Sequence, residues 1–192
     1  KSDKRYLGEN EQILEEQCLK ACKILNMQNP RLGDFPNLNF HNVKSEKIVE
    51  FIEKSILDFK PKTIITHHPS DLNIDHQVAS NLCLAAARLS QRRPDYNLPL
   101  LNNILFMEVL SSTDWAYPKD NNNFTPNSFC QIDEDDFNAK MKALNIYSGV
   151  NRDRPHPRNE ETLRAIALYR GSQCGTQFAE SFQSCFQYYA NK

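Results

Sequence analysis

The sequence predicts an α/β fold, in which helices cover both faces of a sheet. Stretches with an apolar stripe at helical spacing alternate with short segments rich in β-branched and aromatic residues. Breaks between them carry turn residues, such as Asn29-Pro30, Pro61 and Gly149. The 192 residues are 40% apolar and 24% charged, which is the composition of one globular domain with a substantial core.

The expected elements follow one another along the chain after a polar loop over residues 1–8. Helices are expected over residues 10–25 and 45–59, from Asp75 as N-cap to about residue 92, from an Asp133 cap to about Tyr147, and from an Asn159 cap to a stop at Gly171. Strands are expected at 62–66, which should be short and buried, at 104–110, at 129–132 and around 182–186. Because doubly wound domains normally open with a strand, this helix-first order suggests that an opening βαβ unit is absent from the chain.

Composition also excludes several classes of protein. A formal net charge of −1 argues against a nucleic-acid binder, and the absence of an 18-residue apolar run argues against a membrane span. No signal peptide is visible. The six cysteines include no Cys-x-x-Cys pair, and several lie on or beside apolar helical stripes, so we expect buried free thiols and a cytoplasmic location.

The stretch from Ile64 to Arg88 organises the chain, because a strand, a polar loop and a helix follow one another there. The loop is dense in side chains that bind metals or transfer protons: His67, His68, Asp71, Asn73, Asp75 and His76. They follow the carboxyl end of the predicted strand, where open α/β sheets place their sites. We therefore expect the chemistry of the protein in this loop.

The residues alone leave the role of each side chain open. His76 could bind a metal or make only local hydrogen bonds, and catalytic zinc needs about three protein ligands. His67 and His68 are adjacent, so strand alternation sends them to opposite faces and only one is expected to face the site. Asp71 and Asn73 could simply close Asx turns.

A second polar segment lies at Arg154-Pro155-His156-Pro157-Arg158. Arginine presents fixed donors that suit anions or sugar hydroxyls, although a solvated basic loop is the alternative. The long loop over residues 111–127 contains the only tryptophan, Trp115, and loops of this length in compact domains are usually functional or disordered. It is equally compatible with a substrate lid or a subunit contact, which leaves a homo-oligomer open.

Residues 67–76 resemble the second signature of the PIG-L/LmbE-like family of zinc-dependent N-deacetylases. Four further stretches, 108–115, 124–127, 155–158 and 179–182, resemble one bacterial branch of that family. The resemblance covers essentially the whole chain. It implies a Rossmann-like three-layer sandwich with a mostly parallel sheet, and a single deacetylase domain over residues 1–192.

The resemblance also implies a metal site. In the family, zinc is held by a His and an Asp of an N-terminal motif of the type Ala-His-Pro-Asp-Asp-Glu and by the His of the second signature, here His76. The general base is an Asp of the same N-terminal motif. No such motif occurs in these 192 residues. We therefore expect an N-terminally incomplete domain that offers His76 as one zinc ligand, with another divalent metal as an alternative.

The remaining assignments follow from the same resemblance. Asp75, Asn73 and His156 are expected to be catalytic, and His68, Asp71, Arg154 and Arg158 to bind substrate. Many relatives have a His where this chain has Asn73, and Asn can donate a hydrogen bond to an oxyanion but cannot transfer a proton. His156 is therefore nominated to protonate the leaving amine.

The expected reaction is hydrolysis of the N-acyl group, usually acetyl, of an amino sugar or its conjugate. The substrate is accordingly a small molecule or a glycoconjugate. Two alternatives remain open at this point: a non-catalytic carbohydrate-binding protein that kept the fold, and a deacylase that acts on a non-sugar amide.

Overall fold

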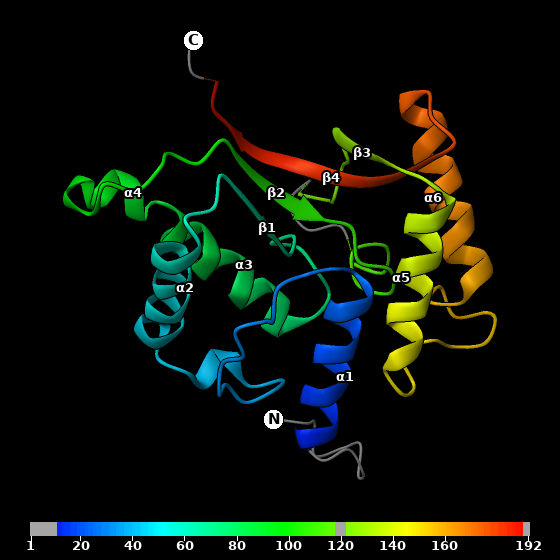
Figure 1. Ribbon diagram of the computed structural model, residues 1–192, viewed down its shortest axis with the longest axis horizontal. Helices are drawn as coiled ribbons and strands as arrows, with labels where there is room; N and C mark the ends of the chain where they lie inside the picture. Colours follow the sequence, from blue (N-terminus) through cyan, green and yellow to red (C-terminus); the bar gives the residue numbers. More distant parts are fainter. Residues whose placement is uncertain (1–10, 118–121, 190–192) are drawn as a thin grey trace. The chain divides into compact units, whose positions relative to one another are not determined.

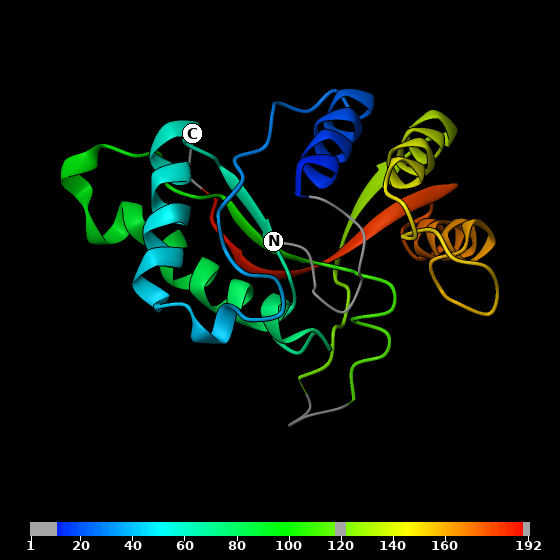
Figure 2. The ribbon, with the colours of Figure 1, turned by 90° about the horizontal axis from the view of Figure 1, so that it is seen from below.

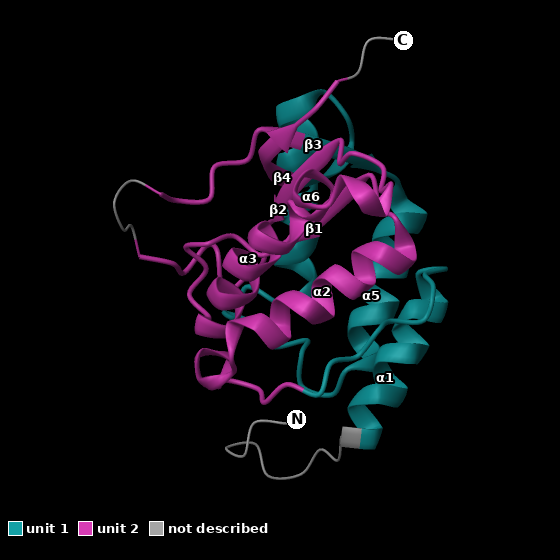
Figure 3. Cartoon of the chain, turned by 90° about the vertical axis from the view of Figure 1, so that its left-hand side faces the viewer, with its two compact units in different colours: residues 1–34, 129–181 teal, residues 35–128, 182–192 magenta. Residues whose placement is uncertain are grey.

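The computed structural model describes residues 11–117 and 122–189, apart from the side chain of Glu11. The chain divides into two compact units, shown in different colours in Figure 3. Unit 1 comprises residues 1–34 and 129–181, and unit 2 comprises residues 35–128 and 182–192. The loop predicted over residues 1–8 lies outside the described residues.

Unit 2 contains the strand–loop–helix segment that the sequence singles out. Its elements are η1 (Phe40–Asn42), α2 (Ser45–Phe59), β1 (Thr63–Thr66), α3 (Ile74–Ala87), α4 (Leu89–Arg92), η2 (Pro94–Tyr96), β2 (Asn103–Met107) and the second half of β4 (Phe178–Gln187). The single helix predicted to run to about residue 92 is thus broken at Arg88, between α3 and α4.

The core of unit 2 lies between its helices and one face of β1. Helices α2 and α3 lie on the same side of β1 and β2 (Figures 1 and 2). Ile56 of α2 and Ala86 of α3 are buried there and pack against Ile64 of β1. The opposite face of β1 is more open, because the side chain of Ile65 is 51% exposed. The prediction of a short buried strand at 62–66 is therefore wrong in its burial: β1 alternates between a covered and an open face.

Unit 1 is built from α1 (Glu11–Ile24), all of β3 (Ser128–Ile132) after its first residue, α5 (Glu134–Ile146), α6 (Glu160–Cys174) and the first part of β4. Helix α1 packs beside α5 (Figure 1). Phe137 of α5 is fully buried and stacks on Phe178, with ring centroids 5.9 Å apart. The predicted Asp133 cap of α5 is confirmed, because Asp133 and Asp136 form a reciprocal capping box.

The sheet confirms the α/β fold and corrects one detail of it. Its strand order is β1-β2-β4-β3. Strands β1 and β2 pair in parallel through the α3 crossover, whereas β4 pairs antiparallel with β2. The sheet is therefore only partly parallel, not mostly parallel. Periodicity along a sequence predicts that a strand exists but carries no information about its direction.

Helix α6 corrects another prediction. It continues through Gly171 to Cys174, and Gly175 is the left-handed C-cap, with φ of 82°. Gly171 sits inside the helix because the chain turns back over it: a Cβ there would lie 2.5 Å from the backbone oxygen of Gln177. Among the described residues, no helix is both long and apolar enough to cross a membrane.

Candidate metal centre

The loop between β1 and α3 is shaped by its own short polar side chains. Asp71 Oδ1 accepts a hydrogen bond from the backbone N–H of Asn73, at 2.8 Å, and Asn73 Oδ1 accepts one from the N–H of Asp75, at 2.9 Å. Asn73 is therefore the N-cap of α3, and Asp75 lies in its first turn. The prediction that Asp75 is the N-cap is wrong, because the turn closed by Asp71 delivers Asn73 to that position first.

Three potential ligands meet in this loop. His67, Asp71 and His76 place one ligand atom each within 4.8 Å of one another. His76 Nδ1 lies 3.0 Å from Asp71 Oδ2, and the Asp71 side chain is completely buried. The rings of His67 and His76 are stacked, with centroids 3.8 Å apart and planes inclined by 9°.

The environment keeps His67 and Asp71 in the protonation states that bind metals. Burial, followed by the neighbouring His76, lowers the pKa of His67 to about 4, although Asp71 acts in the opposite direction. Burial by itself raises the pKa of Asp71, but the hydrogen bonds from His76 and from the backbone of Asn73 lower it below its usual value. At neutral pH the loop therefore offers a neutral His67 imidazole and an ionised carboxylate.

The stacking limits which atoms can share one ion. An imidazole lone pair lies in the plane of its ring, so a single ion cannot lie in the planes of two parallel stacked rings. As arranged, His67 and His76 cannot both bind one metal. His76 fits the ligand role best, because its Nδ1 faces a carboxylate and its Nε2 remains as the donor atom, the usual arrangement of a metal-bound histidine.

Two other predicted site residues, His68 and Asp75, are buried and already make hydrogen bonds or ring contacts within the protein. His68 is completely buried, lies edge-on to the rings of Phe106 and Phe124, and has its Nδ1 2.7 Å from Ser70 Oγ. Its predicted role in substrate binding remains a prediction that this burial does not support. Asp75 is 6% exposed, and its Oδ1 accepts a hydrogen bond from the backbone N–H of Phe40, at 3.0 Å.

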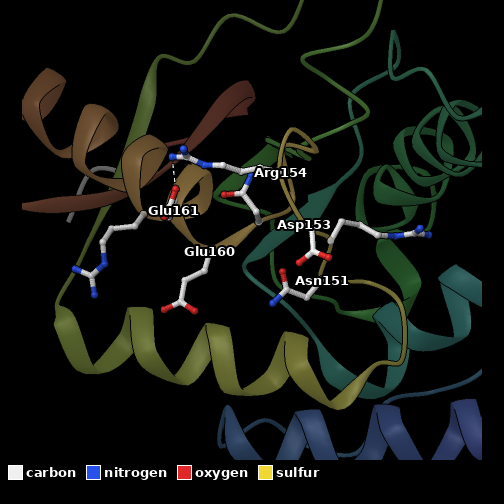
Figure 4. A pocket seen from close by; sticks show the side chains of 8 residues that line it. Asn151, Asp153, Arg154, Glu160 and Glu161 are labelled. Carbon is white, nitrogen blue, oxygen red and sulfur yellow. Dashed lines mark ion pairs between the residues drawn. The ribbon is translucent and has the colours of Figure 1, made fainter.

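The predicted residues of the second polar segment lie in unit 1. His156 is half-buried and its Nδ1 accepts a hydrogen bond from the backbone N–H of Arg158, at 3.1 Å. Arg154 forms an ion pair with Glu161 at a pocket of about 730 Å³ (Figure 4). That pocket is lined by polar and charged side chains only: Asn151, Arg152, Asp153, Arg154, Asn159, Glu160, Glu161 and Arg164. The catalytic role of His156 and the binding roles of both arginines stay predictions.

Sequence reasoning underrated His67. Alternation along the strand showed that only one of the two adjacent histidines would face the site, but nothing in the letters Ile-Ile-Thr-His-His fixes which one. The structure places His67 in the cluster and His68 in the interior. The open side of β1, marked by the exposed Ile65, was not visible in the sequence pattern.

The comparison with protein families identifies the segment that holds the cluster. A family model described as PIG-L, GlcNAc-PI de-N-acetylase, matches residues 1–87. The match is to a PIG-L family domain. The predicted family is thereby confirmed, and the match includes β1, the polar loop and all of α3. A comparison with curated protein sequences gave no match.

Solved structures support the fold of this chain. A 4-carboxy-2-hydroxymuconate hydratase, GalB of Pseudomonas putida KT2440, matches with a TM-score of 0.69 and 18% identity over 95% of this chain and 75% of that one. The N,N'-diacetylchitobiose deacetylase of Pyrococcus horikoshii matches with a TM-score of 0.59 and 17% identity, over 90% of this chain and 63% of that one. Dbv21, a deacetylase of the A40926 pseudoaglycone, matches with a TM-score of 0.62 and 18% identity, over 94% of this chain and 72% of that one. At such identities the likeness shows the fold alone, and one of these enzymes is a hydratase.

Proposed function

We propose that the protein is a zinc-dependent N-deacetylase that hydrolyses the N-acyl group of an amino sugar or its conjugate. One observation carries the proposal: the segment that matches the PIG-L family also holds a buried carboxylate hydrogen-bonded to an imidazole whose second nitrogen is available. The resemblance of the His67–His76 segment to the metal-binding signature of N-deacetylases supports the same reaction. The hydratase neighbour shares only the fold, so it does not favour a second function.

His76 is the residue that we assign to the metal, through Nε2. A bound Zn²⁺ supplies positive charge that polarises the amide carbonyl and makes water a better nucleophile. Asn73 uses its side-chain oxygen to cap α3, so its NH₂ group is the donor that it can offer to a developing oxyanion. Asp75 holds the turn at Phe40 against α3 and thereby acts on the position of the loop.

His156 is proposed to protonate the leaving amine, and Arg154 and Arg158 to contact the substrate. If His156 is the general acid, His156→Ala lowers kcat by about 10²- to 10⁴-fold. A variant whose kcat/KM stays within about twofold of the parent would remove His156 from the mechanism.

The central experiment measures acetate and free amine released from a panel of N-acetyl amino sugars, their phosphates and their nucleotide and lipid conjugates. The protein is first stripped with a chelator and then given one equivalent of Zn²⁺. We expect release that depends on zinc and is lost in His76→Ala. His41→Ala is the matched control, because His41 is an exposed histidine of η1 in the same unit and should keep full activity.

Activity on non-sugar amides alone would show that the substrate is an amide other than an N-acyl amino sugar. Release that is indifferent to chelation or to His76→Ala would contradict the metal-dependent mechanism. Binding of the sugars without release would favour a carbohydrate-binding protein instead.

A further inference from the structure

Asp71 is held by four hydrogen bonds, two at its carboxylate and two at its backbone. Its carboxylate is fully buried, with Oδ2 3.0 Å from His76 Nδ1 and Oδ1 2.8 Å from the N–H of Asn73. Its backbone N–H donates to the carbonyl of His68 at 3.0 Å, and its own carbonyl accepts from Gln77 Nε2 at 2.5 Å. Both carboxylate oxygens and both backbone groups of Asp71 thus have partners in the loop or in the first turn of α3.

We propose that Asp71 is a positioning residue, which fixes His76 as the Nδ1–H tautomer and so presents Nε2 as a lone pair to a divalent cation. The second half of this statement rests on the proposed metal-dependent function. The first half concerns the metal-free chain alone. The proposal replaces the expectation that Asp71 binds substrate, because a side chain with no exposed surface cannot touch one.

The tautomer follows from the chemistry of the pair. An ionised carboxylate can only accept hydrogen bonds, so the proton between Asp71 Oδ2 and His76 Nδ1 belongs to the nitrogen. A neutral imidazole carries one N–H, and its other nitrogen is then the acceptor and ligand atom. The carboxylate therefore decides which nitrogen of His76 can bind a metal.

The stacked ring of His67 fixes the second degree of freedom. With the two rings 3.8 Å apart and nearly parallel, His76 cannot tilt out of its plane without losing contact with His67. His67 is itself anchored on the other side, because its carbonyl accepts a hydrogen bond of 2.7 Å from Ser80 Oγ in α3. Asp71 thus sets the tautomer of His76, and His67 sets the plane of its ring.

Asp71 could in principle be a metal ligand itself. Oδ1 is committed to the N–H of Asn73, so only Oδ2 could turn to the ion, and His76 Nδ1 would then lose its acceptor. The positioning arrangement keeps every hydrogen bond of the loop and still leaves a ligand atom free on His76. It is therefore the arrangement that the observed contacts favour.

The test uses long-range ¹H–¹⁵N correlation spectra of the metal-free protein labelled on histidine, because these spectra distinguish the two tautomers directly. In the parent, His76 should be the Nδ1–H tautomer. In Asp71→Asn one of the two carboxylate oxygens becomes an NH₂ group. With the amide oxygen kept on the N–H of Asn73, the NH₂ group donates to His76 Nδ1, so His76 should shift towards the Nε2–H tautomer. Zn²⁺ affinity, measured by calorimetry, should fall by about 10- to 100-fold in this variant.

Ser80→Ala is the matched control. It removes the hydrogen bond to the carbonyl of His67 without touching Asp71 or His76, so the free energy of unfolding should fall while His76 keeps the tautomer of the parent. If Asp71→Asn unfolds, the parent spectrum alone still tests the tautomer. An Nε2–H form of His76 in the parent, or an Asp71→Asn variant that binds Zn²⁺ as tightly as the parent, would overturn the proposal.

The outcome also separates this proposal from the proposed function. An Nδ1–H tautomer in a parent that binds no Zn²⁺ would uphold the Asp71–His76 pairing and overturn the presentation of Nε2 to a metal. Zn²⁺ binding in a parent that deacetylates nothing would uphold the positioning role and reject the deacetylase instead.

Discussion

Asn73 has two separable properties at the scale of the single residue. Its side-chain oxygen accepts the hydrogen bond from Asp75 that begins α3, and its NH₂ group is a donor. A structural role depends on the oxygen, and the proposed oxyanion role depends on the NH₂ group. Substitutions that remove one property and keep the other can therefore tell the two roles apart.

Asn73→Ala should lower the free energy of unfolding by about 1 kcal/mol, because the backbone N–H of Asp75 in the first turn of α3 loses its acceptor. Asn73→Asp should keep the stability, since Asp caps helices as well as Asn does, but it cannot donate a hydrogen bond. Urea unfolding measures the first effect, and deacetylation at saturating zinc measures the second. Equal stability of the Ala and Asp variants would show that the cap contributes nothing.

The sequence predicted the residues of this site better than their roles. His76, Asp71 and Asn73 could be recognised because ligand-type and turn-forming side chains follow a predicted strand. The partner of each side chain depends on backbone turns only two residues long, and those turns could be closed by Asp71, Asn73 or Asp75 equally well. Composition cannot choose among them, and the nested hydrogen bonds do.

At the scale of the element, helix α6 shows why glycine is an ambiguous signal. Gly171 lies within the helix, where the chain segment at Thr176 and Gln177 folds back onto it, and Gly175 ends the helix in the left-handed conformation. A glycine after a helical stripe predicts a stop, and two such glycines follow the stripe here. Gly171 lets the backbone at Gln177 come close to the helix, and Gly175 forms the C-cap.

Gly171→Ala should destabilise the protein although alanine favours helices. The new Cβ would meet the backbone oxygen of Gln177 at 2.5 Å, and backbone cannot rotate away as a side chain can. Overpacking should lower the free energy of unfolding by about 1–3 kcal/mol, and this outweighs the gain of about 1 kcal/mol in helix propensity.

Gly175→Ala is the comparison within the same helix. Nothing lies within 4 Å of a Cβ at Gly175. The substitution should therefore lower the free energy of unfolding only by the strain of a left-handed residue, about 1–2 kcal/mol. Thermal unfolding of both variants checks the prediction. A Gly171→Ala variant that melts at or above the parent temperature would show that the chain at Gln177 can move aside.

At the scale of the whole molecule, stability should depend on pH through buried histidines. Burial is the first cause that lowers the pKa values of both His67 and His68, and that of His67 falls to about 4. Between about pH 6.5 and pH 4 the unfolded chain binds a proton at His67 that the folded chain does not. Stability is therefore greatest above this window and falls as the pH is lowered through it.

Urea unfolding at pH 7, 6 and 5, in the presence of a chelator, measures this dependence. The free energy of unfolding should decrease with each step, and the decrease should be smaller in His67→Gln. Asp71 contributes with the same sign but at lower pH, since its pKa lies below the usual value. A parent whose stability is unchanged between pH 7 and pH 5 would contradict the burial of a neutral His67.

The α/β class, most helices and the family were accessible from the sequence, because apolar periodicity and local motifs extend over many residues. The direction of β4 and the open face of β1 were not accessible. The first depends on the pairing of distant segments, such as Met107 with Phe182, and the second on which face of β1 the helices cover; local patterns carry no record of either.

Strand β4 serves both units, with Phe178–Ser181 in unit 1 and the residues from Phe182 in unit 2. Its partner in unit 2, β2, precedes it by the whole of β3, α5 and α6. During synthesis on the ribosome, the polar loop after β1 and the helices around it emerge long before β4 pairs with β2. Until then β2 carries an unpaired edge, so a nascent chain halted before β4 is the form most open to aggregation or to capture by a chaperone.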